Sequence, residues 1–263
     1  MIKLIAIDLD DTLLTDDKII TEENKAALHY AHSKGIKVVL CTGRPYLAMK
    51  NLVKEIGLNS PDDFIITFNG AQVRRAATGE VVVENVLSKS DVVAWYEMLS
   101  RLDLPLDAID AQYILEPEEY PEGFASFYSE RISNLEAKKV NFYHLPEDHV
   151  INKMVVCIEE EHLDRQLALI EDSFKDNYST FKSRKFLYEI VAKAVNKGNT
   201  LRKLGEAINI HPEEMLTIGD QENDLTMIQL AGIGVAMGNA VDSVKAAADY
   251  ITEDNNSSGV AQA

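Results

Sequence analysis

The feature that most constrains the fold is a series of short, almost continuous apolar runs separated by amphipathic segments. Three of these runs lie in the first third of the chain: KLIAIDL, IKVVLCT and FIITFN. A strand that is apolar at nearly every position is buried on both faces, which is typical of parallel sheets covered by helices. The pattern therefore predicts an α/β fold with a parallel sheet.

Helix signals fill the segments between the apolar runs. One helix is predicted to open at Thr21 and stop at Gly35, and a second to run from Pro45 to Ile56. The alternation returns near the C-terminus, where the strands MLTIGD and GIGVAMG accompany helices from Thr200 to Ile208 and from Asn223 to Leu230. These two regions are predicted to be halves of one sheet.

The pattern changes between the two halves, where helices and strand-like segments follow one another without regular alternation. We therefore predict a core domain formed by residues 1–84 and 189–263, and an inserted α+β domain formed by residues 85–188. The elements expected near and within the insertion are a hairpin at Thr78 and Gly79, a helix from Asp91 to Leu102, and a helix from His162 to Phe174.

Charge and hydropathy exclude several classes of partner. The formal net charge is −17, which repels polyphosphate backbones and anionic membranes, so nucleic acid and membranes are not expected partners. No apolar run approaches the roughly 18 residues of a membrane span. Asp8 ends the first apolar run too early for a secretory signal, and Cys41 and Cys157 lie in apolar runs as structural residues, so the expected location is cytoplasmic.

Two carboxylates follow the first strand, in the segment DLDDT. Alternation along an extended backbone directs Asp8 and Asp10 to the same side, and crowded carboxylates require a cation or a proton. Open parallel sheets place their ligand sites at this end of the strands. An ordinary strand-to-turn junction would also use Asp and Thr, so the motif alone leaves both interpretations open.

Two further strand ends carry polar residues that could bind an anion. The second strand ends in Thr42, Gly43 and Arg44, which combine a hydroxyl, a flexible residue and a cation, although Thr42 could simply cap a helix. The third strand ends in Asn69-Gly70, a pair that is also a common turn signal.

The C-terminal half supplies an ammonium group and a dense cluster of oxygen ligands. Lys197, in the segment NKG, could carry a compact positive charge to a phosphate oxygen. The strand MLTIGD leads into GDQEND, with Asp220, Asn223 and Asp224, and Mg²⁺ prefers such oxygen ligands. All these segments lie at predicted carboxyl ends of strands in one sheet, which makes coincidence a poor explanation.

The segments DLDDT, TGR, NKG and GDQEND, followed by AMGNA, resemble in this order the motifs of the haloacid dehalogenase superfamily. More narrowly, the chain resembles its Cof-type, sugar-phosphatase-like branch. The resemblance implies a doubly wound, mostly parallel, Rossmann-like core sheet with an inserted α+β cap domain. The residue after Asp10 is often glycine in this superfamily, and we interpret Asp11 as a turn residue.

The resemblance also implies roles for individual residues. Asp8 would be the nucleophile that forms an aspartyl-phosphate, and Asp10 the general acid and base. A Mg²⁺ cofactor would be bound by the Asp8 carboxylate, the Asp10 backbone carbonyl and Asp220, with Asp224 in support. The substrate would be bound by Thr42, Gly43, Arg44, Asn69, Lys197 and Asn223.

The expected function is a Mg²⁺-dependent phosphoric monoester hydrolase that acts on a small phosphorylated metabolite, either a sugar phosphate or a phosphorylated cofactor. A phosphomutase with the same aspartyl-phosphate and a non-catalytic sugar-phosphate-binding protein are the alternatives. A phospho-accepting signalling receiver domain is disfavoured. Such domains are about half as long as this chain, and their acceptor aspartate follows a middle strand rather than the first. The sequence does not select one monoester or an oligomeric state.

Overall fold

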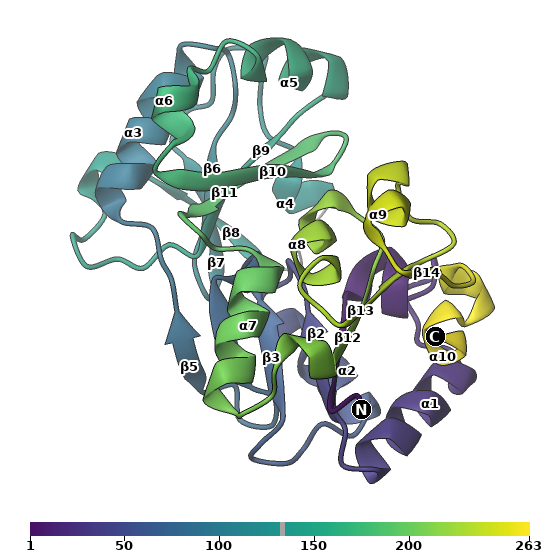
Figure 1. The fold of residues 1–263 in the computed structure, drawn as a ribbon. Coiled ribbons are helices and arrows are strands. Elements are labelled where there is room, and N and C mark those ends of the chain that lie inside the picture. Colours follow the sequence, from purple (N-terminus) through teal and green to yellow (C-terminus); the bar gives the residue numbers. More distant parts are fainter. Residues whose placement is uncertain (132–134) are drawn as a thin grey trace. The chain divides into compact units, whose positions relative to one another are not determined.

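The computed structural model describes residues 1–131 and 135–263, which form two compact units (Figure 1). Residues 1–84 and 196–263 form the core unit, and residues 85–195 form the inserted unit. The boundary that we predicted between residues 188 and 189 falls inside a strand, Leu187–Ala192, which pairs with two other strands of the inserted unit. The inserted unit therefore continues to Val195.

The core unit is built on one eight-stranded sheet, in the order β14-β13-β12-β1-β2-β3-β4-β5. Neighbouring strands are parallel from β14 to β3, and only β4 and β5 run antiparallel to their neighbours. The strands are β1 (Leu4–Ile7), β2 (Lys37–Cys41), β3 (Phe64–Thr67), β4 (Gln72–Arg75), β5 (Val81–Glu84), β12 (Met215–Gly219), β13 (Ile233–Ala236) and β14 (Tyr250–Ile251).

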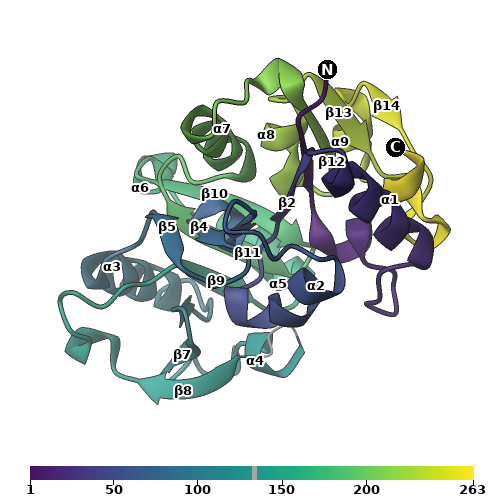
Figure 2. The same ribbon diagram turned by 90° about the horizontal axis from the view of Figure 1, so that it is seen from below.

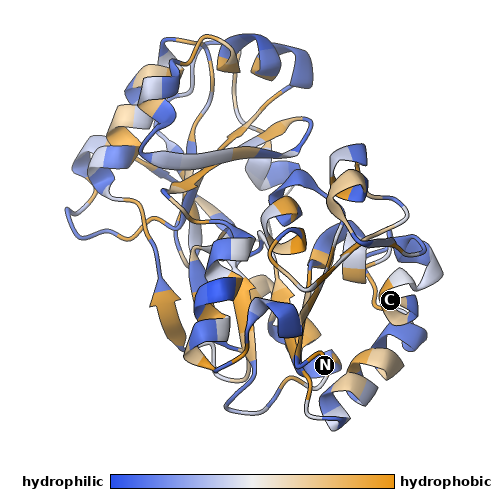
Figure 3. Cartoon of the chain, viewed as in Figure 1, coloured by the Kyte–Doolittle hydropathy of each residue, from blue (hydrophilic) through white to orange (hydrophobic). Residues whose placement is uncertain are grey.

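Helices cover both faces of this sheet, and apolar residues of its strands form a buried cluster on each side. The core strands are coloured mainly as hydrophobic in Figure 3. Leu28 and Val53 pack on one face, and Leu201 and Leu204 on the other. The helices are α1 (Glu22–Ser33), α2 (Lys50–Glu55), α7 (Lys197–Ala207), α8 (Leu225–Ile228), α9 (Asp242–Ala247) and α10 (Gly259–Gln262). The predicted α/β class with a doubly wound, mostly parallel core sheet is confirmed.

The C-terminal segment packs against the first helix, so that α1 and α10 lie side by side (Figures 1 and 2). The hydroxyl groups of Thr21 and Ser258 lie 2.8 Å apart, and the side chain of Asn24 accepts a hydrogen bond from the backbone of Ala261. These contacts hold the C-terminal segment against the N-terminal part of the core unit.

The inserted unit has its own six-stranded, mostly antiparallel sheet, in the order β10-β11-β9-β6-β7-β8. Trp95 and Leu163, from two of its helices, are fully buried in the apolar cluster on one face of this sheet. The strands are β6 (Asp107–Ile109), β7 (Tyr113–Pro117), β8 (Glu136–Val140), β9 (Lys153–Cys157), β10 (Tyr178–Arg184) and β11 (Leu187–Ala192). The helices are α3 (Lys89–Ser100), α4 (Tyr128–Arg131), α5 (Glu160–Leu167) and α6 (Asp172–Lys175).

Four predicted helices differ from the observed ones. Of the two near the C-terminus, α7 begins at Lys197 rather than Thr200, and α8 spans only Leu225–Ile228 because a single turn, Glu222–Asp224, precedes it. The helix predicted from Pro45 is replaced at its start by a single turn, Tyr46–Ala48, and α2 begins only at Lys50. Tertiary contacts explain the late start, because the Tyr46 hydroxyl donates to the carbonyl of Ala76 in a distant segment. The helix predicted from His162 to Phe174 is two helices, α5 and α6, which are separated where Ile170 turns into the core.

The predicted hairpin at Gly79 connects β4 and β5, and the glycine adopts a φ of 77° that favours this residue type.

Across residues 1–131 and 135–263, we find no helix with the length and apolar character that crossing a bilayer requires.

Candidate active site

Asp8 lies directly beyond β1, the central strand that pairs with both β12 and β2. Its backbone N–H donates to the carbonyl of Ile218, which continues the parallel ladder and fixes the position of the residue. Asp8 is 6% exposed, whereas Asp220 and Asp224 are completely buried. Of these three carboxylates, only Asp8 can be reached from solvent.

Lys197 is the first residue of α7 and is fully buried. Its ammonium group donates to Oδ1 of Asp8 and, at 2.6 Å, to Oδ1 of Asp224. Burial alone would lower the pKa of Lys197, but the charges of Asp224 and Asp8 outweigh burial and raise that pKa above its ordinary value. Lys197 is therefore a permanent cation between two carboxylates.

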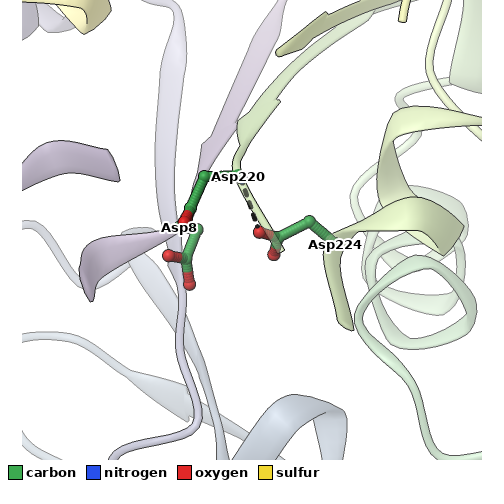
Figure 4. Close-up of side chains that lie close together, drawn as sticks. All are labelled: Asp8, Asp220 and Asp224. Carbon is green, nitrogen blue, oxygen red and sulfur yellow. Dashed lines mark hydrogen bonds between the residues drawn. The ribbon is translucent and has the colours of Figure 1, made fainter. Parts of the chain in front are cut away.

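The side chains of Asp8, Asp220 and Asp224 converge at the ends of β1 and β12, within 4.8 Å of one another (Figure 4). Burial, reinforced by Asp224, raises the pKa of Asp220 to about 7. Burial also raises the pKa of Asp8 well above its ordinary value, although Lys197 opposes this effect. Among the described residues, these three carboxylates face the one ammonium group of Lys197, so ionisation of all three leaves a net charge of −2 in the cluster.

Asp220 and Asp224 differ in their remaining capacity to bind a metal. Oδ2 of Asp224 accepts from the backbone N–H of Asp220 at 2.9 Å (Figure 4) and from that of Gln221 at 3.1 Å, and its Oδ1 accepts from Lys197. Asp220 accepts from the Thr12 hydroxyl at 2.7 Å through Oδ1, and its Oδ2 is buried without a hydrogen-bond partner among the described residues. The buried Oδ2 of Asp220 is therefore suited to a divalent cation, whereas Asp224 orients Lys197 and the loop.

A second group of predicted residues is joined across the ends of β2 and β3. Thr42 is fully buried, its hydroxyl accepts from the backbone N–H of Arg44 at 3.1 Å, and its carbonyl accepts from the backbone N–H of Asn69 at 2.9 Å. The side-chain amide of Asn223 donates to Oδ1 of Asn69 at 3.0 Å. A Cβ atom at Gly43 would lie 3.1 Å from the Asn69 amide nitrogen, so glycine permits this close approach.

The turn after β1 places the remaining predicted residue, Asp10, beside Arg44. Its carboxylate accepts from Nε of Arg44 at 2.8 Å and from Nη2 at 2.6 Å. The next residue, Asp11, has a φ of 60°, in the region that favours glycine, and Asn239 donates to its carbonyl at 2.7 Å. The interpretation of Asp11 as a turn residue agrees with this backbone conformation.

Sequence reasoning missed two residues that shape the site. Thr12 holds Asp220 by a hydrogen bond, although it lies in the quoted segment DLDDT. Thr226 accepts from the backbone N–H of Gly198 at 3.0 Å, and a Cβ at Gly198 would lie only 2.2 Å from the Thr226 carbonyl oxygen. The glycine of NKG was the available signal, because it allows α7, which carries Lys197, to approach α8.

Comparison with known proteins places the chain in a family. Residues 5–263 match the family model of haloacid dehalogenase-like hydrolases. The chain is 37% identical to YxeH of Bacillus subtilis over 263 residues, which cover 100% of this chain and 97% of YxeH. It is 32% identical to the 5-amino-6-(5-phospho-D-ribitylamino)uracil phosphatase YcsE of Bacillus subtilis, over 100% of this chain and 94% of YcsE.

A solved structure gives the same result at the level of the fold. The crystal structure of a haloacid dehalogenase-like hydrolase from Bacteroides thetaiotaomicron superimposes with a TM-score of 0.83 at 31% identity, covering 100% of this chain and 98% of the other. The prediction of an enzyme of this superfamily is thereby confirmed. The chain belongs to the haloacid dehalogenase-like hydrolase family.

Proposed function

We propose that the chain is a Mg²⁺-dependent phosphatase that hydrolyses small phosphate monoesters through an aspartyl-phosphate on Asp8. The observation that carries this proposal is the cluster around Asp8: the only solvent-accessible carboxylate of three, held by a buried ammonium group. The names of its relatives support phosphatase activity.

In the first step, a carboxylate oxygen of Asp8 attacks phosphorus, and the bond between phosphorus and the leaving oxygen breaks. Asp10 gives its proton to that oxygen. In the second step, water attacks the aspartyl-phosphate, Asp10 takes a proton from the water, and the bond between phosphorus and Asp8 breaks to release inorganic phosphate. Lys197 keeps Asp8 in one orientation throughout, because it holds Oδ1 of that carboxylate.

The residues present fit a magnesium ion. Two uncompensated negative charges, and an Oδ2 of Asp220 that has no hydrogen-bond partner in the part of the chain that the structure describes, favour a divalent cation with oxygen ligands. In the proposal, the ion is held by the Asp8 carboxylate, the Asp10 backbone carbonyl and Asp220, and Asp224 supports them through Lys197 and the loop amides. Bound Mg²⁺ would offset the negative charge and polarise a phosphoryl oxygen.

The phosphoryl group would be bound by Lys197 together with Thr42, the Gly43 backbone and Asn223. Thr42 and Asn223 are tied together through Asn69, so their polar groups are fixed before the substrate arrives. Asn69 would face the substrate beyond the phosphate. The guanidinium group of Arg44 pairs with the Asp10 carboxylate in this structure.

The proposed substrate class is a small phosphorylated metabolite, either a sugar phosphate or a phosphorylated cofactor or its precursor. The relative YcsE is named as the phosphatase of a phosphorylated ribityl compound, which is a small phosphate monoester of this kind. The strongly acidic composition supports small substrates over nucleic acid or membranes, and a cytoplasmic location is part of the same proposal.

The test is release of inorganic phosphate from a panel of monoesters, with Mg²⁺ or with EDTA, by the wild type and Asp8→Asn. We expect release that requires Mg²⁺ and that falls at least ~10³-fold in Asp8→Asn, because no nucleophile remains. Asp172→Asn is a matched control, because this aspartate side chain is 98% exposed. Release that survives both EDTA and Asp8→Asn would refute the mechanism, and accumulation of an isomer without phosphate would identify a phosphomutase.

A further inference from the structure

Both carboxylate oxygens of Asp10 are engaged by one side chain. Nε of Arg44 donates to Oδ2 at 2.8 Å, and Nη2 donates to Oδ1 at 2.6 Å. Lys18 lies farther away, with its Nζ 3.5 Å from Oδ1, and donates to Asp11 instead. The planar guanidinium matches the carboxylate with two parallel bonds, and this geometry fixes the rotamer of Asp10 more closely than a point charge would.

The backbone of Arg44 is held in place on both sides. Its N–H donates to the Thr42 hydroxyl at 3.1 Å, and its carbonyl accepts from the N–H of Phe68 at 3.3 Å. Arg44 follows β2 and Asp10 follows β1, so the pair links loops at the ends of two adjacent parallel strands. The side chains are 26% and 27% exposed, so water screens the pair only in part. Because the backbone of Arg44 is fixed beside the sheet, the pair can restrict the motion of the Asp10 side chain.

This arrangement has a consequence for the proposed reaction. A general acid needs only one oxygen to exchange a proton with the leaving group and then with water. Each oxygen of Asp10 accepts one guanidinium bond and has a second lone pair. A protonated oxygen accepts more weakly than an ionised one, so the bond to the oxygen that carries the proton should weaken. The bond to the other oxygen can remain and hold the carboxyl group at the angle that proton transfer requires.

We propose that Arg44 is a positioning residue for Asp10, which holds one carboxylate oxygen through turnover while the other exchanges a proton with the leaving group. This inference rests on the proposed function. It differs from the prediction made from the sequence, in which Arg44 contacts the substrate. The two roles are distinguishable, because a positioning residue acts only through Asp10.

Leaving groups of different acidity provide the test. An alkyl phosphate, such as a hexose 6-phosphate, needs a proton on its departing oxygen, whereas p-nitrophenolate departs readily without one. We would measure single-turnover rates of both substrates with the wild type, Arg44→Gln, Arg44→Lys, Asp10→Asn and the double variant Asp10→Asn/Arg44→Gln. Single turnovers isolate the first step from hydrolysis of the aspartyl-phosphate.

Arg44→Gln should lower the rate with the alkyl phosphate by about 100-fold, the scale of a misplaced catalytic group, and the rate with p-nitrophenyl phosphate by less than about fivefold. Arg44→Lys should recover part of the loss, because it keeps the charge but not the two-bond geometry. In the Asp10→Asn background, Arg44→Gln should have almost no further effect. Arg75→Gln, which removes an arginine paired with Glu80 instead, is the matched control and should leave both rates unchanged.

Equal losses with both substrates, or a loss from Arg44→Gln that persists in the Asp10→Asn background, would overturn the inference and favour substrate contact. If the wild type turns over neither substrate nor any other monoester, the proposed function itself fails. These outcomes separate the two claims.

Discussion

Replacing Asp220 with asparagine should stabilise the metal-free protein at pH 8 and abolish its stabilisation by Mg²⁺. Asp220 is completely buried beside Asp8 and Asp224, and its Oδ2 has no hydrogen-bond partner among the described residues. The amide removes the charge but can still accept the hydrogen bond of Thr12 through Oδ1. The substitution therefore isolates the cost of an ionised carboxylate at this position.

The magnitude follows from the pKa of Asp220, which burial and then Asp224 raise from 3.8 to about 7. One pKa unit corresponds to about 1.4 kcal/mol. Because the folded pKa exceeds the unfolded one, folding is penalised increasingly as pH rises from 4 to 7, and the penalty is constant above that range. It amounts to about 2 kcal/mol at pH 5 and about 4 kcal/mol at pH 8. These are upper limits, since a proton on Asp8 relieves part of the repulsion.

The assay is thermal unfolding of the whole chain, in which the transition of the core unit is followed at pH 5 and pH 8, each in EDTA and in excess Mg²⁺. In EDTA, Asp220→Asn should unfold at a higher temperature than the wild type, with a larger gain at pH 8. The wild type should gain about 2.7 kcal/mol from Mg²⁺ at 100 times its Kd, and the variant almost nothing. A lower unfolding temperature of the variant in EDTA at pH 8, or an undiminished Mg²⁺ effect, would refute the reasoning. Asp172→Asn should change neither quantity.

Two further substitutions test the surroundings of the site and the inserted unit. Gly198→Ala places a Cβ 2.2 Å from the Thr226 carbonyl oxygen, so it should lower the free energy of unfolding in urea by about 3 kcal/mol. It should also lower phosphatase activity, because it displaces Lys197. An unchanged urea midpoint of unfolding would contradict this close packing. Burial raises the pKa of Asp107 to about 7, although hydrogen bonds from the hydroxyls of Ser126 and Tyr120 oppose this shift. The inserted unit should therefore lose stability as pH rises from 4 to 7. Asp107→Asn should flatten that pH dependence in thermal unfolding, and an unchanged slope would assign it to other groups.

The sequence predicted the sheet and the edge that carries the site because the relevant signals are local. Continuous apolar runs identified β1, β2, β3 and β12, and parallel strands bring their carboxyl ends to one edge of a sheet. Asp8, Lys197, Asp220 and Asp224 could therefore be expected in one place, and the structure brings them together. The late start of α2 could not be predicted, because a contact between Tyr46 and the distant Ala76 overrides local helix propensity.

The hydrogen-bond partners of the side chains could not be predicted from the sequence for a different reason. They depend on which oxygen atom lies within reach of which donor in the folded chain. Asp220 and Asp224 are chemically identical and four residues apart. The backbone amides of the loop nevertheless point towards Asp224, and Oδ2 of Asp220 has no hydrogen-bond partner within residues 1–131 and 135–263.

Arg44 shows the same dependence. The residue type and its place after β2 suggested a substrate contact, but the turn at Asp11 presents Asp10 to the guanidinium. A pattern of residues thus predicts which residues form the site. The role of each residue depends on hydrogen bonds that are determined only by the folded backbone.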